Sequence, residues 1–359
     1  MKIFKFIIIV ISAAAAILFS ALLFFVFTEY KPAESEVLTP VYDSALSQTA
    51  DESPTPGGLR ILTWNTGYCG LNTETDFFLE GGSNTDRLPL ERQRTALNEI
   101  IGFIDAQEAD ICLLQEVDTD SKRSWSKDQL YTAVSVLKNY EAYYAINYKS
   151  PFVPVPLESP IGRVKSGIAM FSRYAVSRAE RLKLPGQFSW PVRLFHLKRC
   201  ALISSIPSPV AGKNWYIINV HLSAYDEGGM REMQLEYVKN LITELYADGH
   251  YVVVGGDWNL LLPGTDKTQF GSYNTSEENL GWVKTMPATW TPGNWQWCYD
   301  EETPTARSLE QPYSAGENFT CIIDGFLVSP NLRVDEVEAF NLRFEHSDHN
   351  PAAITVSIR

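Results

Sequence analysis

Short apolar runs, several of which end in a polar residue, are the feature of this sequence that most restricts its fold. Runs of this length and composition predict strands that are buried on both faces, and such strands occur in sheets covered on either side. The chain must therefore supply helices or a second sheet to cover them. The runs occupy residues 59–64, 110–115, 167–172, 201–206, 215–220, 251–256 and 321–328.

Helical periodicity alternates with these runs and supplies the covering elements. The predicted helices span residues 91–106, 127–137 and 230–247. Because no change of composition divides residues 59–359, we expect one α/β domain in which two or more sheets have helices outside them. Residues 261–316 show neither period and are predicted as loop. The remaining strand patterns lie at residues 140–148, 332–341 and 352–358.

A polar side chain with catalytic or metal-binding chemistry stands after several of the predicted strands. Loops diverge at strand ends in open sheets, so binding groups collect there. Any one of these residues has an ordinary structural explanation, such as a turn or a buried histidine satisfied by a neighbour. Their repetition at strand ends instead indicates a functional site. They are Asn65, Glu116, His221, Asp257 with Asn259, Asp324, and Asp348 with His349.

These residue types favour one reaction class. Carboxylate and carboxamide oxygens suit hard cations such as Mg²⁺, and histidines with carboxylate partners suit proton transfer or stabilisation of developing charge. The sequence has no G-x-S-x-G nucleophile motif, no G-x-x-x-x-G-K-[ST] phosphate loop and no G-x-G-x-x-G dinucleotide motif. Metal-assisted attack of water on phosphorus fits best.

The strand ends also carry short motifs in a fixed order. They are Thr63-Trp64-Asn65, Leu114-Gln115-Glu116-Val117, Asn219-Val220-His221-Leu222, Gly255-Gly256-Asp257-Trp258-Asn259, Ile323-Asp324-Gly325-Phe326-Leu327-Val328-Ser329 and Ser347-Asp348-His349-Asn350-Pro351. This series resembles the endonuclease/exonuclease/phosphatase superfamily, which includes deoxyribonuclease I, apurinic endonucleases, sphingomyelinases and inositol polyphosphate 5-phosphatases. The resemblance implies a four-layered α/β sandwich, with two mixed β-sheets packed face to face and helices outside.

The resemblance further implies a metal-dependent hydrolase of phosphoester bonds. Glu116 is the main expected ligand of Mg²⁺ or Mn²⁺, with Asn65 close by and Asp348 assisting. The resemblance identifies a superfamily and leaves the substrate open.

The catalytic roles are also implied by the resemblance. Asp257 orients or deprotonates the attacking water, and Asn259 holds a phosphate oxygen. Asp324 orients the imidazole of His349, which contacts the phosphoryl group, while His221 binds phosphate or aids the leaving group. Which of Asp257 and His349 takes the proton stays open.

The N-terminus predicts membrane attachment. Lys2 and Lys5 precede an uncharged, mostly apolar stretch at residues 6–27, which is long enough to span a bilayer. We expect residues 1–28 to form an uncleaved anchor, with a cleaved signal peptide and secretion as the alternative. The catalytic domain then lies outside the cytoplasm. Residues 29–58 are rich in Pro, Ser, Thr and Glu and are predicted as a flexible linker.

Several substrates remain open at this point. The 30 Lys and Arg residues against 43 Asp and Glu give a net charge of −13, which argues against strong non-specific binding to nucleic acid. A phosphodiesterase acting on a lipid headgroup or small phosphoester ranks first, because an anchor brings lipid within reach. An extracytoplasmic nuclease, a phosphomonoesterase of inositol phosphate type and an inactive binding module are the alternatives. We expect a monomer.

Two further readings concern tryptophans and cysteines. The tryptophans between residues 282 and 297 suit either a membrane interface or a core beneath their own loop. Cys298 and Cys321 are a possible disulfide pair among five cysteines, none of which forms a C-x-x-C motif.

Overall fold

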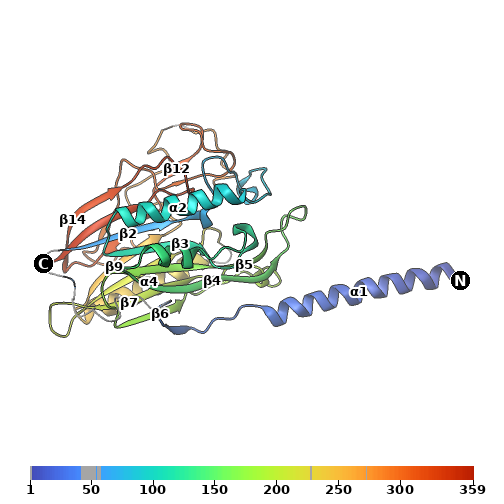
Figure 1. The fold of residues 1–359 in the computed structure, drawn as a ribbon, viewed down its shortest axis with the longest axis horizontal. Helices are drawn as coiled ribbons and strands as arrows, with labels where there is room; N and C mark the ends of the chain where they lie inside the picture. Colours follow the sequence, from blue (N-terminus) through green and yellow to red (C-terminus); the bar gives the residue numbers. More distant parts are fainter. Residues whose placement is uncertain (1, 42–53, 55–57, 227–228, 272) are drawn as a thin grey trace.

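The computed structural model describes residues 2–41, 54, 58–226, 229–271 and 273–359. Two β-sheets face each other in the folded part, and a long N-terminal helix, α1, projects from it (Figure 1). The predicted fold class is confirmed, because both large sheets are mixed and helices cover their outer faces. α1 spans Lys2–Thr28.

The larger sheet of the described chain has seven strands in the order β1-β6-β7-β8-β9-β13-β10. Its only parallel pair is β8 with β9, and the other neighbours are antiparallel. The strands are β1 (Ser35–Leu38), β6 (Arg178–Lys183), β7 (Cys200–Pro207), β8 (Asn214–His221), β9 (Tyr251–Asp257), β10 (Gln296–Cys298) and β13 (Asp324–Val328).

The second sheet has six strands in the order β14-β15-β2-β3-β5-β4, and β2 with β3 is its parallel pair. A short ribbon of β11 (Ala306–Arg307) and β12 (Thr320–Cys321) lies within the long loop region. The strands are β2 (Leu59–Asn65), β3 (Ile111–Asp118), β4 (Glu141–Val153), β5 (Gly162–Ser172), β14 (Leu332–Ala339) and β15 (Ala352–Ile358).

Three apolar cores separate the layers. The central core joins the inner faces of the two sheets, through side chains such as Ile61 and Leu113 from one and Trp215 and Phe326 from the other. α2 (Leu90–Ala106) and α3 (Gln129–Val136) cover the outer face of the six-stranded sheet. α4 (Met230–Ala247) covers the outer face of the seven-stranded sheet. Burial of both faces explains the continuous apolar runs.

The structure shows where the tryptophans of the long loop and the five cysteines lie. Trp282, Trp290 and Trp295 are buried, and the latter two belong to the core beneath α4. Trp290 also contacts Trp258 edge to face. These rings are therefore core residues, and the membrane-interface reading is wrong for them. All five cysteines are free and buried, so the predicted pairing of Cys298 with Cys321 is not made.

The linker prediction needs correction for residues 29–41. Ser35–Leu38 forms β1 and pairs with β6, in register from Ser35 opposite Leu182 to Leu38 opposite Ala179. The Pro- and Glu-containing composition suggested a coil, but an open sheet edge supplies backbone partners to a short segment regardless of its composition. Residues 42–53 and 55–57 of the predicted linker lie outside the described residues.

Candidate active site

Strand register brings three of the predicted side chains to adjacent positions. In the parallel pair β8–β9, His221 lies opposite Asp257, and in the antiparallel pair β9–β13, Asp324 lies opposite Asp257. All three are almost fully buried. The Nε2 atom of His221 is 3.3 Å from Oδ2 of Asp257. The order of strands in one sheet thus assembles a row of two carboxylates and an imidazole.

The other sheet contributes Asn65 at the end of β2. Its Nδ2 donates to Oδ2 of Asp257 at 3.0 Å, and its Oδ1 accepts from the Gly67 amide at 3.1 Å. Asn65 therefore connects the two sheets at their common end. Asp257 in turn receives the backbone N–H of Asn259 on Oδ1 at 2.9 Å, while the Asn259 side chain donates to the carbonyl of Leu222.

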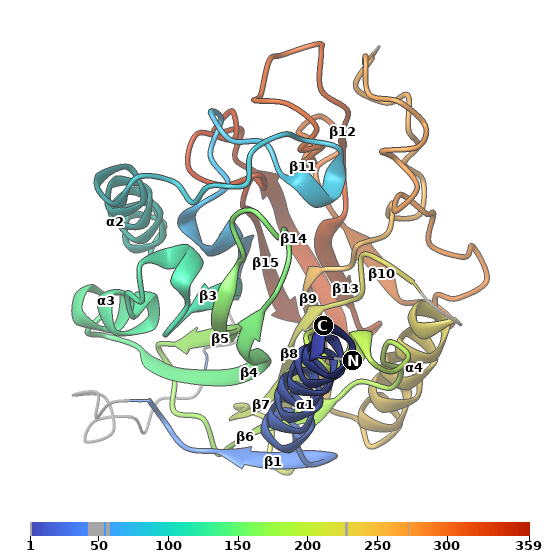
Figure 2. The same ribbon diagram turned by 90° about the vertical axis from the view of Figure 1, so that its right-hand side faces the viewer.

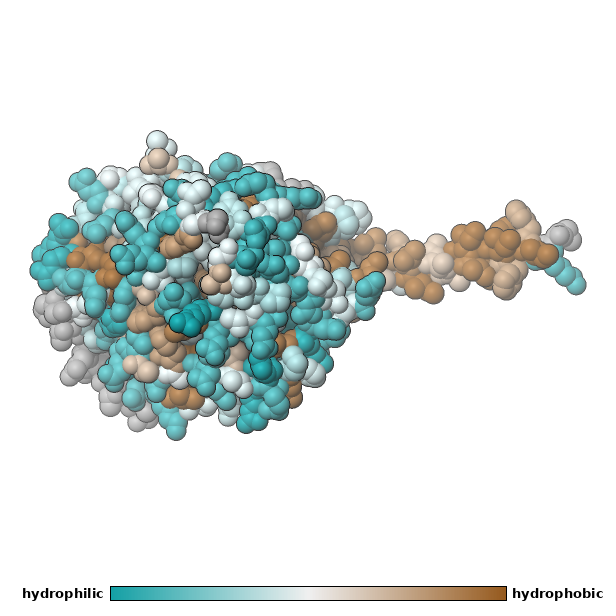
Figure 3. All heavy atoms as spheres, turned by 90° about the horizontal axis from the view of Figure 1, so that it is seen from above, coloured by the Kyte–Doolittle hydropathy of each residue, from teal (hydrophilic) through white to brown (hydrophobic). Residues whose placement is uncertain are grey.

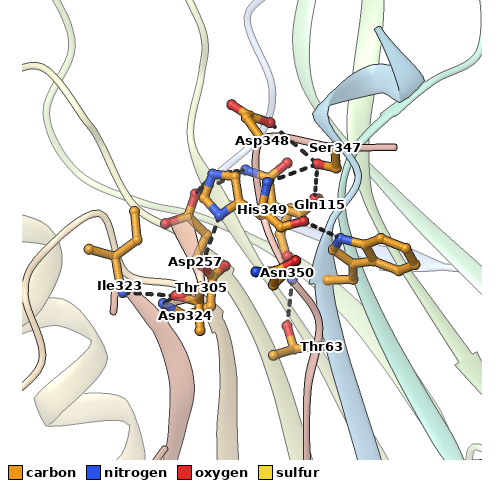
Figure 4. A network of polar contacts seen from close by, with 12 residues as sticks. Thr63, Gln115, Asp257, Thr305, Ile323, Asp324, Ser347, Asp348, His349 and Asn350 are labelled. Atoms are coloured by element: carbon orange, nitrogen blue, oxygen red, sulfur yellow. Dashed lines mark hydrogen bonds and ion pairs between the residues drawn. The ribbon is translucent and has the colours of Figure 1, made fainter. Parts of the chain in front are cut away.

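The loop of residues 347–350 delivers His349 to this row. Nδ1 of His349 is 2.8 Å from Oδ2 of Asp324, and Nε2 is 4.0 Å from Oδ2 of Asp257 (Figure 4). The loop is fixed from both sides, since the Ser347 hydroxyl donates to the Asn65 carbonyl and the Trp64 indole donates to the His349 carbonyl. The predicted pairing of Asp324 with His349 is present in this geometry.

Glu116 reaches the site through an irregularity in β3. The pairing of β3 with β5 shifts between Leu114 and Val117, and Glu116 has a positive φ of 57°. A bulge of this kind re-aims a side chain, and the strained backbone conformation is typical of functional positions. The Asp348 carboxylate lies near enough to Glu116 for its charge to raise the pKa of Glu116.

Gly67 makes room for Asp348. A Cβ on Gly67 would lie 2.6 Å from Oδ1 of Asp348, and the residue has a positive φ of 50°. Gly256 has a similar role beneath the row, because its φ is 143° and a Cβ there would lie 2.0 Å from the Val220 carbonyl oxygen. Both positions therefore require glycine.

Burial and charge separate the protonation behaviour of the central groups. Burial and the Asp324 carboxylate raise the pKa of Asp257 to about 7. Burial lowers the pKa of His349, but the Asp324, Asp348 and Asp257 carboxylates together outweigh it and hold that pKa well above its ordinary value. Burial, followed by the Arg199 guanidinium, holds the pKa of His221 well below its ordinary value. Neighbouring groups with divergent pKa values are typical of acid–base sites.

The carboxylates suit a hard divalent cation. Burial raises the pKa of both Glu116 and Asp348, and the Asp348 charge adds to the effect on Glu116. Such mutual repulsion is relieved when a cation lies between the carboxylates. A second group also has ligand geometry, since donor atoms of Asp257, Asp324 and His349 lie within 4.8 Å of one another. Its members already bond to one another or to Asn65, so Glu116 and Asp348 fit the ion better.

Sequence reasoning missed several residues of this region. Arg199, just before β7, interacts with the charges of Glu116 and Asp257, and its buried Nη1 has no hydrogen-bond partner among the described residues. Gln115 and Asn219 hydrogen bond across the two sheets at 2.8 Å. Glu80 lies near Asp348, and burial raises its pKa to about 8. The basic Lys198-Arg199 pair before a strand was the available signal.

Thr305 and Arg307 support the site from the long loop. The Thr305 hydroxyl accepts from the Asp324 amide at 3.0 Å and so positions that residue. Arg307 is buried and donates to the carbonyls of Asn72 and Thr75. Its guanidinium therefore holds a loop, and burial lowers its pKa.

Comparison with known proteins agrees with this geometry. The profile of the Endonuclease/Exonuclease/phosphatase family matches residues 62–349. No curated protein matches the chain.

Solved structures with the same fold include an endonuclease/exonuclease/phosphatase from Beutenbergia cavernae DSM 12333, with a TM-score of 0.52 and 18% identity over 84% of this chain and 72% of that one. The corresponding protein from Bacteroides vulgatus gives 0.51 and 15%, covering 84% and 99%. D. rerio TDP2 complexed with single strand DNA product gives 0.51 and 16%, covering 84% and 99%. At these identities the likeness concerns the fold.

Proposed function

Because this chain belongs to the endonuclease/exonuclease/phosphatase family, whose members are metal-dependent phosphoester hydrolases, we propose that it hydrolyses a phosphodiester by in-line attack of water. The observation that carries the proposal is the convergence of His221, Asp257, Asp324 and His349 from two sheets and a loop onto one buried row. A purely structural site has no need of paired carboxylates and imidazoles with opposed pKa shifts.

Asp257 is the group that accepts the proton of the attacking water. Its pKa of about 7 lets it be ionised yet basic near neutral pH. Asn65 and the backbone of Asn259 hold its two oxygens, so the carboxylate is kept in one orientation. The neighbouring carboxylates, Asp324 foremost, hold the pKa of His349 well above its ordinary value, so we propose that His349 stays protonated and that Asp257 takes the proton.

His349 instead donates a hydrogen bond from its Nε2 N–H to a phosphoryl oxygen and keeps its proton. The bond from Nδ1 to Asp324 at 2.8 Å leaves Nε2 as the free donor of the ring, apart from a weak approach to Asn65 at 3.4 Å. A fixed cationic donor of this kind stabilises charge that develops on phosphorus oxygens. Asn259 and His221 are proposed to hold further oxygens of the same phosphoryl group or of the leaving group.

Glu116, Asp348 and Asn65 are proposed to hold Mg²⁺ or Mn²⁺. The ion would supply charge neutralisation for the phosphoryl and leaving oxygens. Glu116 and Asp348 carry raised pKa values because burial and neighbouring charge disfavour their ionised forms without a cation. Gly67 leaves the space beside Asp348 that this arrangement needs.

We further propose that α1 anchors the enzyme in a membrane, with residues 59–359 outside the cytoplasm and a lipid headgroup or small phosphoester as substrate. α1 is long and apolar enough to cross a bilayer, although a signal sequence has the same properties. Its apolar surface is exposed and stands out against the polar domain surface (Figure 3). Mg²⁺ as the ion, a monomeric state and this location are parts of the proposal.

The test is hydrolysis of bis-p-nitrophenyl phosphate by the purified full chain, with Mg²⁺, Mn²⁺ or chelator. The proposal predicts metal-dependent release of p-nitrophenol and a large loss in Glu116→Ala and His349→Ala, with circular dichroism confirming that both variants fold. Full activity in chelator, or in either variant, contradicts it. A parallel screen of sphingomyelin, phosphatidylinositol phosphates, soluble inositol phosphates and plasmid DNA separates the diesterase from the phosphomonoesterase and nuclease alternatives.

A further inference from the structure

The direction of the strands places α1 at the catalytic end of the domain. β8 and β9 run in the same direction and end at His221 and Asp257. β7 is antiparallel to β8, β6 to β7 and β1 to β6. β1 therefore begins where β8 and β9 end, and α1, which immediately precedes it, leaves the molecule there. Figure 1 agrees, because α1 extends from the end of the sandwich toward which β2 points, and Figure 2 looks along α1 onto that end.

The junction between α1 and the domain is held by buried contacts. The Glu29 carboxylate is 4% exposed and lies 3.0 Å from Nζ of Lys198 and 3.6 Å from Nε of Arg193. The Phe25 ring packs edge to face on Phe195, and the Tyr30 hydroxyl approaches the Ile146 carbonyl at 3.5 Å. With β1 paired to the sheet just beyond, these contacts attach the end of the helix to the domain.

The exposed length of α1 sets how near the domain lies to a membrane. Residues 2–21 are exposed throughout, and partial burial begins at Leu22. The uncharged stretch of residues 6–27 gives about 33 Å at 1.5 Å per residue, slightly more than the hydrocarbon core of about 30 Å. The last turns of α1 then lie at the headgroup level, and they already contact the domain. The catalytic end is thus placed directly on the membrane surface.

Exposed apolar side chains border the same end. The β6–β7 loop presents Trp190 at 56% exposure and Val192 at 42%, and it also contains the residues that bind Glu29. The β4–β5 loop presents Leu157 at 86%. That loop also lies at the catalytic end, because β4 and β3 are both antiparallel to β5, and β3 is parallel to β2. Tryptophan and leucine at such a position suit a lipid interface.

The contact with α1 continues directly into the catalytic centre. Lys198 binds Glu29, and the next residue, Arg199, interacts with the charges of Glu116 and Asp257. Its buried Nη1 has no partner in the described part of the chain and remains available to an anion. One short segment therefore contacts both the anchor and the place where a phosphoryl group binds.

We infer that the domain stands on the bilayer with its catalytic end facing the lipid, so that its substrate is a phosphoester headgroup in the membrane that α1 spans. This inference rests on the proposed hydrolase activity and on retention of α1. A long polymer in solution, such as DNA, would have to enter between the catalytic end and the membrane surface. The chain's net charge of −13 gives such a polyanion no general attraction.

Orientation is tested without reference to activity. The full chain carrying Val192→Cys or Val210→Cys is labelled with bimane and reconstituted in phosphatidylcholine vesicles that contain a doxyl-labelled lipid. The two valines are a matched pair, since each is 42% exposed and Val210 lies in the β7–β8 loop at the opposite end. The native cysteines are buried and do not compete for label.

The inference predicts that the label at residue 192 loses most of its fluorescence to the lipid quencher while the label at residue 210 keeps its own. Equal quenching at both residues, stronger quenching at 210, or quenching at neither would overturn it.

Substrate class is tested with charged substitutions of Leu157 and Trp190, the exposed apolar rim of the catalytic end. Leu157→Asp and Trp190→Asp should lower hydrolysis of sphingomyelin or phosphatidylinositol phosphate in the same vesicles about 10-fold, because the rim no longer enters the interface. Both should leave hydrolysis of soluble bis-p-nitrophenyl phosphate unchanged. Val210→Asp is the control and should change neither rate.

The outcomes separate this inference from the proposed function. If bis-p-nitrophenyl phosphate is hydrolysed but no vesicle lipid is, or if plasmid DNA is cleaved and lipid is not, the headgroup assignment is wrong and the hydrolase proposal stands. If rim substitutions leave the lipid rate unchanged, membrane contact by these loops is wrong. If neither soluble nor lipid substrate is hydrolysed, the proposed function itself fails, whatever the quenching shows.

Discussion

Replacing Asp324 by asparagine isolates the charge that holds His349. The two residues are 0% and 8% exposed, and their bond is 2.8 Å long. Asparagine keeps the size and one acceptor oxygen but removes the charge. A buried hydrogen bond to a charged group contributes about 1.5–3 kcal/mol. If that stabilisation acts on the transition state through His349, kcat should fall about 10- to 100-fold.

The assay is steady-state hydrolysis of bis-p-nitrophenyl phosphate with saturating Mg²⁺, together with thermal unfolding to confirm the fold. Asp335→Asn is the control, because it makes the same chemical change in the exposed part of β14. The double variant Asp324→Asn with His349→Gln should be no slower than His349→Gln alone, since Asp324 acts through the imidazole. An Asp324→Asn enzyme with wild-type kcat, or additive losses in the double variant, would refute the pairing.

Three other substitutions or probes test separate parts of the structure. Glu29→Ala should destabilise the full chain by about 3 kcal/mol in thermal unfolding, because it leaves the buried Lys198 charge without its carboxylate. Glu34→Ala is the control and should change nothing measurable, because the Glu34 side chain that pairs with Lys183 is 82% exposed. Gly67→Ala should abolish metal-dependent hydrolysis, because the added Cβ would crowd Asp348. Gly102→Ala is the control: its added Cβ in α2 would have no other atom within 4 Å, and it should stabilise the fold by about 0.5–1 kcal/mol. Finally, the thiols of the native protein should not react with Ellman's reagent, because all five are buried, and all five should react after denaturation. Rapid labelling of the native protein would contradict their burial.

The sequence alone predicted the helices and strands whose apolar residues all pack into one core. Strands buried on both faces, such as β9, and the helix α4 at Met230–Ala247 were predicted closely because their apolar period is set by the core alone. β6 was missed because Arg178–Lys183 has a largely polar sequence and receives its backbone partners from β7. β1 was missed for the same reason, since pairing at an edge depends on a neighbouring strand and little on composition.

The site was predictable where chemistry coincides with a strand end. Asn65, His221, Asp257 and Asp324 each end or begin a strand, so their types and positions pointed to one place. Arg199 lacked such a signal, because a basic residue before a strand is usually a solvated charge. The position of its buried Nη1 near the Glu116 charge follows from the packing of two segments distant in the sequence. Sequence reasoning also could not orient α1, which depends on the pairing of β1 with β6.

The most direct test of the central claim is to measure Mn²⁺ binding and hydrolysis in the same titration. Electron paramagnetic resonance follows free Mn²⁺, while p-nitrophenol release from bis-p-nitrophenyl phosphate follows the rate. If Glu116, Asp348 and Asn65 hold the catalytic ion, Mn²⁺ binding and activity should saturate together in the wild-type chain. Glu116→Gln should weaken both without unfolding the protein. Undiminished hydrolysis by the wild-type chain in excess chelator, or by Glu116→Gln at the same Mn²⁺ concentration, would contradict it.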